Sequence, residues 1–76
     1  MEKLIEILED IESGVDYENC TTLVDDNYLD SLAIISLVAE IEDEFGVQIP
    51  TVEVIPENFN SAKSIWNLIQ RLQAED

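Results

Sequence analysis

The sequence predicts an all-α fold: a small bundle of three main helices plus one short helix, in a single domain over residues 1–76. Three segments repeat their apolar residues at the spacing of an amphipathic helix. Residues 47–49 are the alternative, a possible strand, but a strand without a clear partner is marginal. A domain this short buries only about 60% of the surface of its unfolded chain, so we expect one small core.

The first helix is predicted at the start of the chain. Its apolar residues follow an i, i+1, i+4, i+7 pattern, and acidic residues fill most of the other positions. These apolar residues are Leu4, Ile5, Leu8 and Ile11. We expect the helix to end near Ser13 and Gly14, because glycine commonly terminates helices.

An irregular segment follows over residues 15–30, where the helical period disappears and Asp, Asn and Thr accumulate. Connections of this length in a compact domain tend to be functional or to be held by their own side chains. We expect its apolar residues to attach it to the core. They are Leu23, Val24, Tyr28 and Leu29.

The second main helix is predicted to begin at Asp30 or Ser31, either of which suits an N-cap, and to reach Phe45 before Gly46 ends it. Its core face consists of Ile34, Leu37, Val38, Ile41 and Phe45. A short helix over residues 56–59 comes next. The last helix begins at Ser61, and its predicted core face consists of Ala62, Ile65, Leu68, Ile69 and Leu72.

A second apolar stripe lies on the predicted second helix, well away from the core face at roughly 100 degrees per residue. It consists of Leu32, Ile35 and Ala39, with polar neighbours that include Glu42 and Asp43. An exposed apolar patch with a polar rim is typical of a partner surface, so we predict that these five residues dock partner proteins. The alternative is one broad buried face, in which Tyr28 or Leu29 covers Leu32.

The chain is strongly acidic, with 18 Asp and Glu against 3 Lys and Arg and a formal net charge of −15. Such a surface repels nucleic acids and anionic lipids and attracts basic protein surfaces, although it also confers solubility alone. No segment approaches the roughly 20 apolar residues of a membrane span, and the start lacks the features of a signal peptide. We therefore expect a soluble, cytoplasmic monomer that inserts into no membrane.

The residues provide poorly for catalysis or metal binding. Histidine is absent, the single cysteine Cys20 has no partner for an internal disulfide, and no second group is spaced to activate a serine. A calcium loop starting at Asp25 would need oxygen ligands at position 5 and glycine at position 6, where Leu29 and Asp30 stand. We predict neither an enzyme nor a metal site.

Ser31 is better suited to being modified than to acting on a substrate. A residue at a helix N-terminus lies near solvent, and the amides and the helix dipole there favour a phosphate. A simple capping serine is the alternative, and local physics alone favours it because caps are common.

Four features together resemble an acyl or peptidyl carrier protein. They are the Asp-Ser-Leu tripeptide at residues 30–32, the long loop before it, the Glu-Asp-Glu-Phe end of the second helix (residues 42–45) and the Ile-Pro pair at residues 49–50. The resemblance covers the whole chain. It implies an acyl-carrier-like helical bundle. It also implies that Ser31, preceded by the acidic Asp30, carries a covalent 4'-phosphopantetheine arm derived from coenzyme A, which makes the chain a phosphoprotein.

The resemblance also implies the partners. They are a phosphopantetheinyl transferase, an acyl- or aminoacyl-loading enzyme, and a downstream acyltransferase or synthase, all docking through the second helix and its preceding loop. The cargo is held as a thioester, and catalysis belongs to the partners. An acidic helical interaction module without a prosthetic group is the alternative function.

Some positions are similar to the D-alanyl carrier proteins of teichoic acid modification. They are Leu29, the Asp25-Asp26 pair, the Phe59-Asn60-Ser61 segment, Ile65 and Asn67. Tyr28 stands where many carriers have glycine, and Ala33 and Ser36 stand where fatty-acid carriers tend to be acidic. These departures argue against the partners of a fatty acid pathway, and a stand-alone carrier of a polyketide or peptide pathway is the alternative subclass.

Because like charges repel within the folded chain, we expect the melting temperature to rise with added salt or with millimolar divalent ions. Thermal unfolding followed by circular dichroism across a salt series measures this. A flat or falling dependence would contradict the charge argument.

Overall fold

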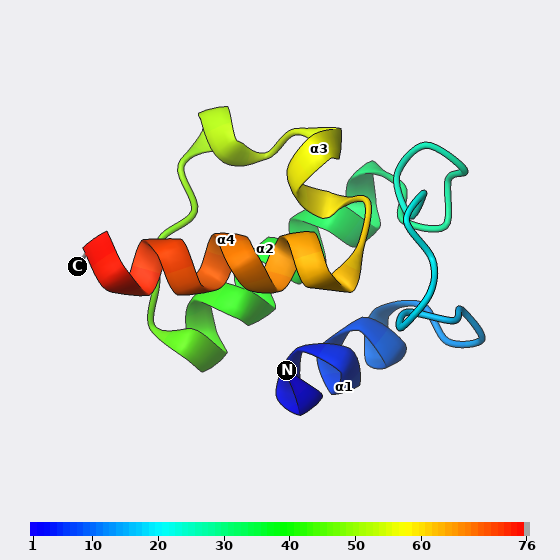
Figure 1. The fold of residues 1–76 in the computed structure, drawn as a ribbon, viewed down its shortest axis with the longest axis horizontal. Coiled ribbons are helices and arrows are strands. Elements are labelled where there is room, and N and C mark those ends of the chain that lie inside the picture. The colour runs from blue at the N-terminus through cyan, green and yellow to red at the C-terminus, as the bar shows by residue number, and fades with distance from the viewer. Residues whose placement is uncertain (76) are drawn as a thin grey trace.

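A computed structural model describes residues 1–75 and has the predicted all-α architecture. Its elements are α1 (Glu2–Ile11), α2 (Ser31–Phe45), the 3-10 helix η1 (Thr51–Glu53), α3 (Pro56–Phe59) and α4 (Ala62–Glu75). α1 packs against α2 and also contacts α4, and α3 packs against α4 (Figure 1). No strand occurs within residues 1–75, and the 47–49 segment instead buries Val47 and Ile49 in the core.

Helix α1 ends at Ile11, slightly before the predicted Ser13 and Gly14. Its last turn is closed by the Glu12 amide, which donates to the Leu8 carbonyl at 2.8 Å. Leu4 and Leu8 are fully buried as predicted, whereas Ile5 and Ile11 are only partly buried. Ile7, which the predicted face omitted, is buried. The buried face is therefore rotated slightly from the one that the spacing predicted.

Helix α2 has the predicted bounds, and the structure decides between its two candidate caps. Asp30 is the N-cap: its Oδ1 accepts a hydrogen bond from the Ala33 amide at 2.8 Å. Ser31 is the first residue of the helix proper. Gly46 ends the helix at φ +67°, a left-handed conformation that glycine adopts without steric cost.

The predicted core faces of α2 and α4 both contribute to one hydrophobic core. All five residues of the predicted α4 face are buried. On α2, Leu37 and Ile41 are fully buried, and the other three predicted residues are partly buried. The rings of Phe45 and Trp66 pack edge to face, with their centroids 5.8 Å apart. At the start of α4, Ser61 Oγ accepts a hydrogen bond from the Ser64 amide at 3.0 Å, in the manner of an N-cap.

The long loop is attached to the core by buried side chains, as predicted for Leu23 and Leu29. Val24 is partly buried. The prediction for Tyr28 was wrong, because this side chain is 46% exposed. The Leu29 amide donates to the Leu23 carbonyl at 2.9 Å and closes a turn between the two leucines, which leaves Tyr28 on the outside of that turn.

Tyr17 is a second buried attachment of the loop, and the sequence pattern did not reveal it. Its hydroxyl donates to the Leu8 carbonyl at 3.1 Å and contacts the Glu12 carbonyl, both at the end of α1. Burial raises the pKa of Tyr17 to about 12, with smaller contributions from the negative charges of Glu12, Glu9 and Cys20. The neutral phenol thus closes the C-terminal end of α1.

No helix in the described part of the chain, residues 1–75, combines the length and apolar character that a membrane crossing requires.

Because the folded pKa of Tyr17 lies above its ordinary value of 10.0, the folded state retains this proton while the unfolded chain loses it. Its contribution to stability is therefore fully present below pH 10 and is lost as the pH rises toward 12. We expect Tyr17→Phe to lose about 1 kcal/mol at neutral pH and to lack this alkaline decrease. Denaturant unfolding across that range measures both effects.

Tyr28→Phe is the matched control, since it removes an exposed phenol. It should retain the wild-type decrease in unfolding free energy above pH 10. An identical alkaline profile for Tyr17→Phe and the wild type would contradict the role given to the Tyr17 hydroxyl.

Candidate functional site

Ser31 lies at the N-terminal end of α2 with its side chain exposed. Asp30 takes the capping position, so the Ser31 hydroxyl is not needed to satisfy the first turn of the helix. No hydrogen bond within residues 1–75 engages this hydroxyl. The reading of Ser31 as a plain capping serine was therefore wrong: its oxygen is accessible.

The surroundings of Ser31 favour an anion. The Ala33 amide donates to Asp30 Oδ1, and the Ile34 amide donates to the Asp30 carbonyl at 2.9 Å. The amides of Ser31 and Leu32 have no acceptor within the described residues, as expected at the first turn of a helix. A phosphate joined to Ser31 would lie at the positive end of the helix dipole.

The predicted docking residues lie largely in solvent. Leu32 is 75% exposed and Ile35 is 65% exposed, and Ala39 and Asp43 are also exposed. Tyr28 and Leu29 therefore do not cover Leu32, and the alternative of one broad buried face is wrong. Glu42 differs from the rest: it is partly buried, and its Oε2 accepts a hydrogen bond from the Ile49 amide at 2.9 Å. One of its oxygens thus holds the segment that follows α2.

Two large apolar side chains after α2, which the sequence pattern did not reveal, are also exposed. Val52 in η1 is 79% exposed, and Ile55 is also exposed. A groove of about 280 Å³ joins the two elements; it is lined by Ile34, Ile35, Val38, Ile49, Thr51 and Val54. A three-residue helix has no periodicity that could mark an apolar face, so the sequence carried no signal for Val52.

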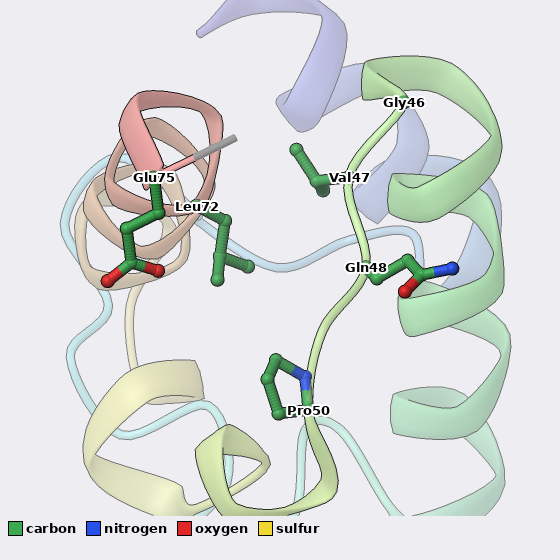
Figure 2. A pocket seen from close by; sticks show the side chains of 6 residues that line it. All are labelled: Gly46, Val47, Gln48, Pro50, Leu72 and Glu75. Atoms are coloured by element: carbon green, nitrogen blue, oxygen red, sulfur yellow. The ribbon is translucent and has the colours of Figure 1, made fainter.

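A separate open hollow of about 470 Å³ lies between α4 and the segment after α2 (Figure 2). Val47, Gln48, Pro50 and Leu72 are among the residues that line it, and the Gln48 side chain projects toward α2 in Figure 2. Gly46, at its rim, is at the other end of α2 from Ser31, about 22 Å away at 1.5 Å per residue. This hollow therefore has no part in the site at Ser31.

The site has the chemistry of an acceptor. Asp30, the acidic neighbour of Ser31, is engaged as the helix cap, and the sequence contains no histidine to act as a general base. Cys20 is partly buried, with its sulfur 3.8 Å from Thr22 Oγ1 in the loop. No group of acidic residues or cysteine within residues 1–75 is arranged to hold a metal ion. An exposed hydroxyl beside two free amides does fit a phosphodiester-linked group.

Comparisons with known proteins agree with this geometry. A family model described as a phosphopantetheine attachment site matches residues 2–72. A D-alanyl carrier protein of Enterococcus faecalis is 34% identical over 74 residues, which cover 95% of each chain. A D-alanyl carrier protein of Streptococcus equi subsp. zooepidemicus is 35% identical over 66 residues, which cover 87% of this chain and 78% of that protein.

Proposed function

Because the chain belongs to the phosphopantetheine-attachment family and is a carrier protein, we propose that Ser31 bears its arm and that D-alanine is its cargo. The observation that carries the first part is the free, exposed Ser31 hydroxyl at the first residue of α2. The second part is supported by the relatives named D-alanyl carrier proteins, which match most of the chain.

The carrier is not an enzyme; it presents covalently held cargo to enzymes that modify and load it. The attached 4'-phosphopantetheine supplies a terminal thiol, on which the cargo is held as a thioester. Ser31 Oγ forms the phosphodiester bond when the pyrophosphate linkage of coenzyme A breaks and the adenosine bisphosphate leaves. The hydroxyl proton passes to a base of the transferase, since this chain holds no histidine and Asp30 is engaged as the cap.

The proposed partners are a phosphopantetheinyl transferase, a D-alanine-loading enzyme and a downstream acyltransferase. We propose that they dock on Leu32, Ile35, Ala39 and Asp43, with Glu42 at the margin. An apolar patch in a chain of net charge −15 suits a partner with an apolar pocket and a basic rim. The proposal places the protein in the cytoplasm, where coenzyme A is available.

Incubation with coenzyme A and a phosphopantetheinyl transferase should add the mass of one arm to the chain. Ser31→Ala should add none, because it lacks the accepting oxygen. Intact-mass spectrometry measures both. Ser36→Ala is the matched control, since it removes another exposed hydroxyl of the same helix and should leave the mass gain unchanged.

A wild-type chain that gains no mass would contradict the attachment site and would favour the acidic interaction module. The cargo is tested on the arm-bearing protein with a D-alanine-loading enzyme. Labelled D-alanine should become bound through a linkage that hydroxylamine cleaves, as it does a thioester. Equal loading of L-alanine or of a fatty acid would contradict the D-alanine assignment.

Ile35→Glu should raise the KM of the loading enzyme for the carrier, because a charge would enter the apolar contact. Stability should change by less than about 0.5 kcal/mol, as for other exposed positions. Steady-state loading and denaturant unfolding measure the two effects. Ala74→Glu adds the same charge at an exposed position near the end of α4 and should leave KM unchanged. A large loss of stability in Ile35→Glu would show that Ile35 supports the core.

A further inference from the structure

Asn60 lies between α3 and α4, far along the chain from Ser31, and it forms hydrogen bonds with the loop that leads to Ser31. Its Oδ1 accepts hydrogen bonds from the amides of Val24 at 3.0 Å and Asp25 at 3.1 Å. Its Nδ2 donates to Asp25 Oδ2 at 3.2 Å. Its carbonyl accepts a bond from the Leu23 amide at 2.9 Å. The side-chain oxygen, the side-chain nitrogen and the backbone carbonyl of Asn60 thus all form hydrogen bonds with one turn of the loop.

These contacts are unusual in their reach along the chain. Within residues 1–75, and leaving ion pairs aside, Asn60 takes part in every hydrogen bond that joins residues more than about ten positions apart. All other attachment of the loop over such distances is apolar packing, which is non-directional. Directional bonds from Asn60 therefore set the orientation of this turn relative to α4.

The turn that Asn60 holds ends beside the proposed attachment site. The Leu29 amide closes it on the Leu23 carbonyl, and Asp30 and Ser31 follow directly. Within the turn, Asp25 and Tyr28 are exposed. An enzyme that reacts at Ser31 meets this surface, and a surface held in one orientation avoids the entropic cost of ordering it on binding.

We infer that Asn60 is a positioning residue for recognition of the carrier: it holds the turn of residues 23–29 in the orientation that the phosphopantetheinyl transferase binds. The inference rests on the proposed function of Ser31. Asn60 contacts neither the hydroxyl nor the arm, so its loss should raise the KM of the transferase for the carrier and leave kcat near the wild-type value.

The paired side chains of Asn60 and Asp25 allow a reciprocal exchange. In Asn60→Asp, an oxygen still faces the two amides, but two carboxylates meet where a donor met an acceptor. In Asp25→Asn, the amide oxygen still accepts from Asn60 Nδ2, so the bond survives. In the double variant, the amide group introduced at position 25 donates to the carboxylate introduced at position 60, and the bond is restored in the opposite direction.

Steady-state transfer from coenzyme A, run well below the melting temperature of each variant, measures KM and kcat. We expect Asn60→Asp to raise KM about five-fold or more, Asp25→Asn to stay within about two-fold of the wild type, and the double variant to return toward the wild type. Amide hydrogen exchange at Leu23, Val24 and position 25 should be faster in Asn60→Asp and should slow again in the double variant.

Leu72→Ala, which destabilises the core away from the turn, is the control for a purely structural effect and should leave KM unchanged. If Asn60→Asp is not folded at the assay temperature, Asn60→Ser takes its place, with the same expected rise in KM. Three outcomes would overturn the inference. They are an unchanged KM in the folded Asn60 variant, a double variant whose KM stays as high as that of Asn60→Asp, and a rise in KM in Leu72→Ala equal to that in the Asn60 variant. A wild-type chain that accepts no arm would overturn the proposed function, and this inference with it.

Discussion

The hydrogen bond from the Ala33 amide to the Asp30 carboxylate caps helix α2 at Asp30, so the helix begins at Ser31, and the proposed site depends on that starting point. Serine and aspartate are both good N-caps, so either residue was able to take the position. With Asp30 as the cap, Ser31 becomes the first helical residue and its hydroxyl remains free. A capping Ser31 would have used that oxygen to satisfy an amide of the first turn.

The same small core must hold a long loop that has no regular secondary structure. Tyr17, Leu23 and Leu29 anchor it by burial, and Asn60 orients its last turn by hydrogen bonds. Such anchoring suits a domain of 76 residues. A few buried side chains attach the loop to the core, so the loop needs neither strand pairing nor an additional helix. The loop can then present exposed acidic and aromatic side chains beside Ser31.

A carrier needs features that a merely stable domain would avoid. Leu32, Ile35 and Val52 leave large apolar side chains in water, and the net charge of −15 opposes compaction. In the proposed function both features act on partner enzymes: the charge attracts a basic rim, and the apolar surface offers buried contact area. Ser31, the proposed attachment residue, directly precedes Leu32, so the proposed docking surface and attachment site share helix α2.

The sequence alone determined the helices, the glycine stop at Gly46 and the core face of α4, because these follow from spacing and capping along the chain. It also singled out Ser31 and the exposed stripe of α2, although only the family resemblance linked Ser31 to an arm. The tertiary structure alone decided which residue caps α2, that Tyr17 is buried and Tyr28 is not, and that Asn60 holds a turn 35 residues away. Periodicity records which face of one helix is apolar, whereas these outcomes depend on contacts between segments that no local pattern relates.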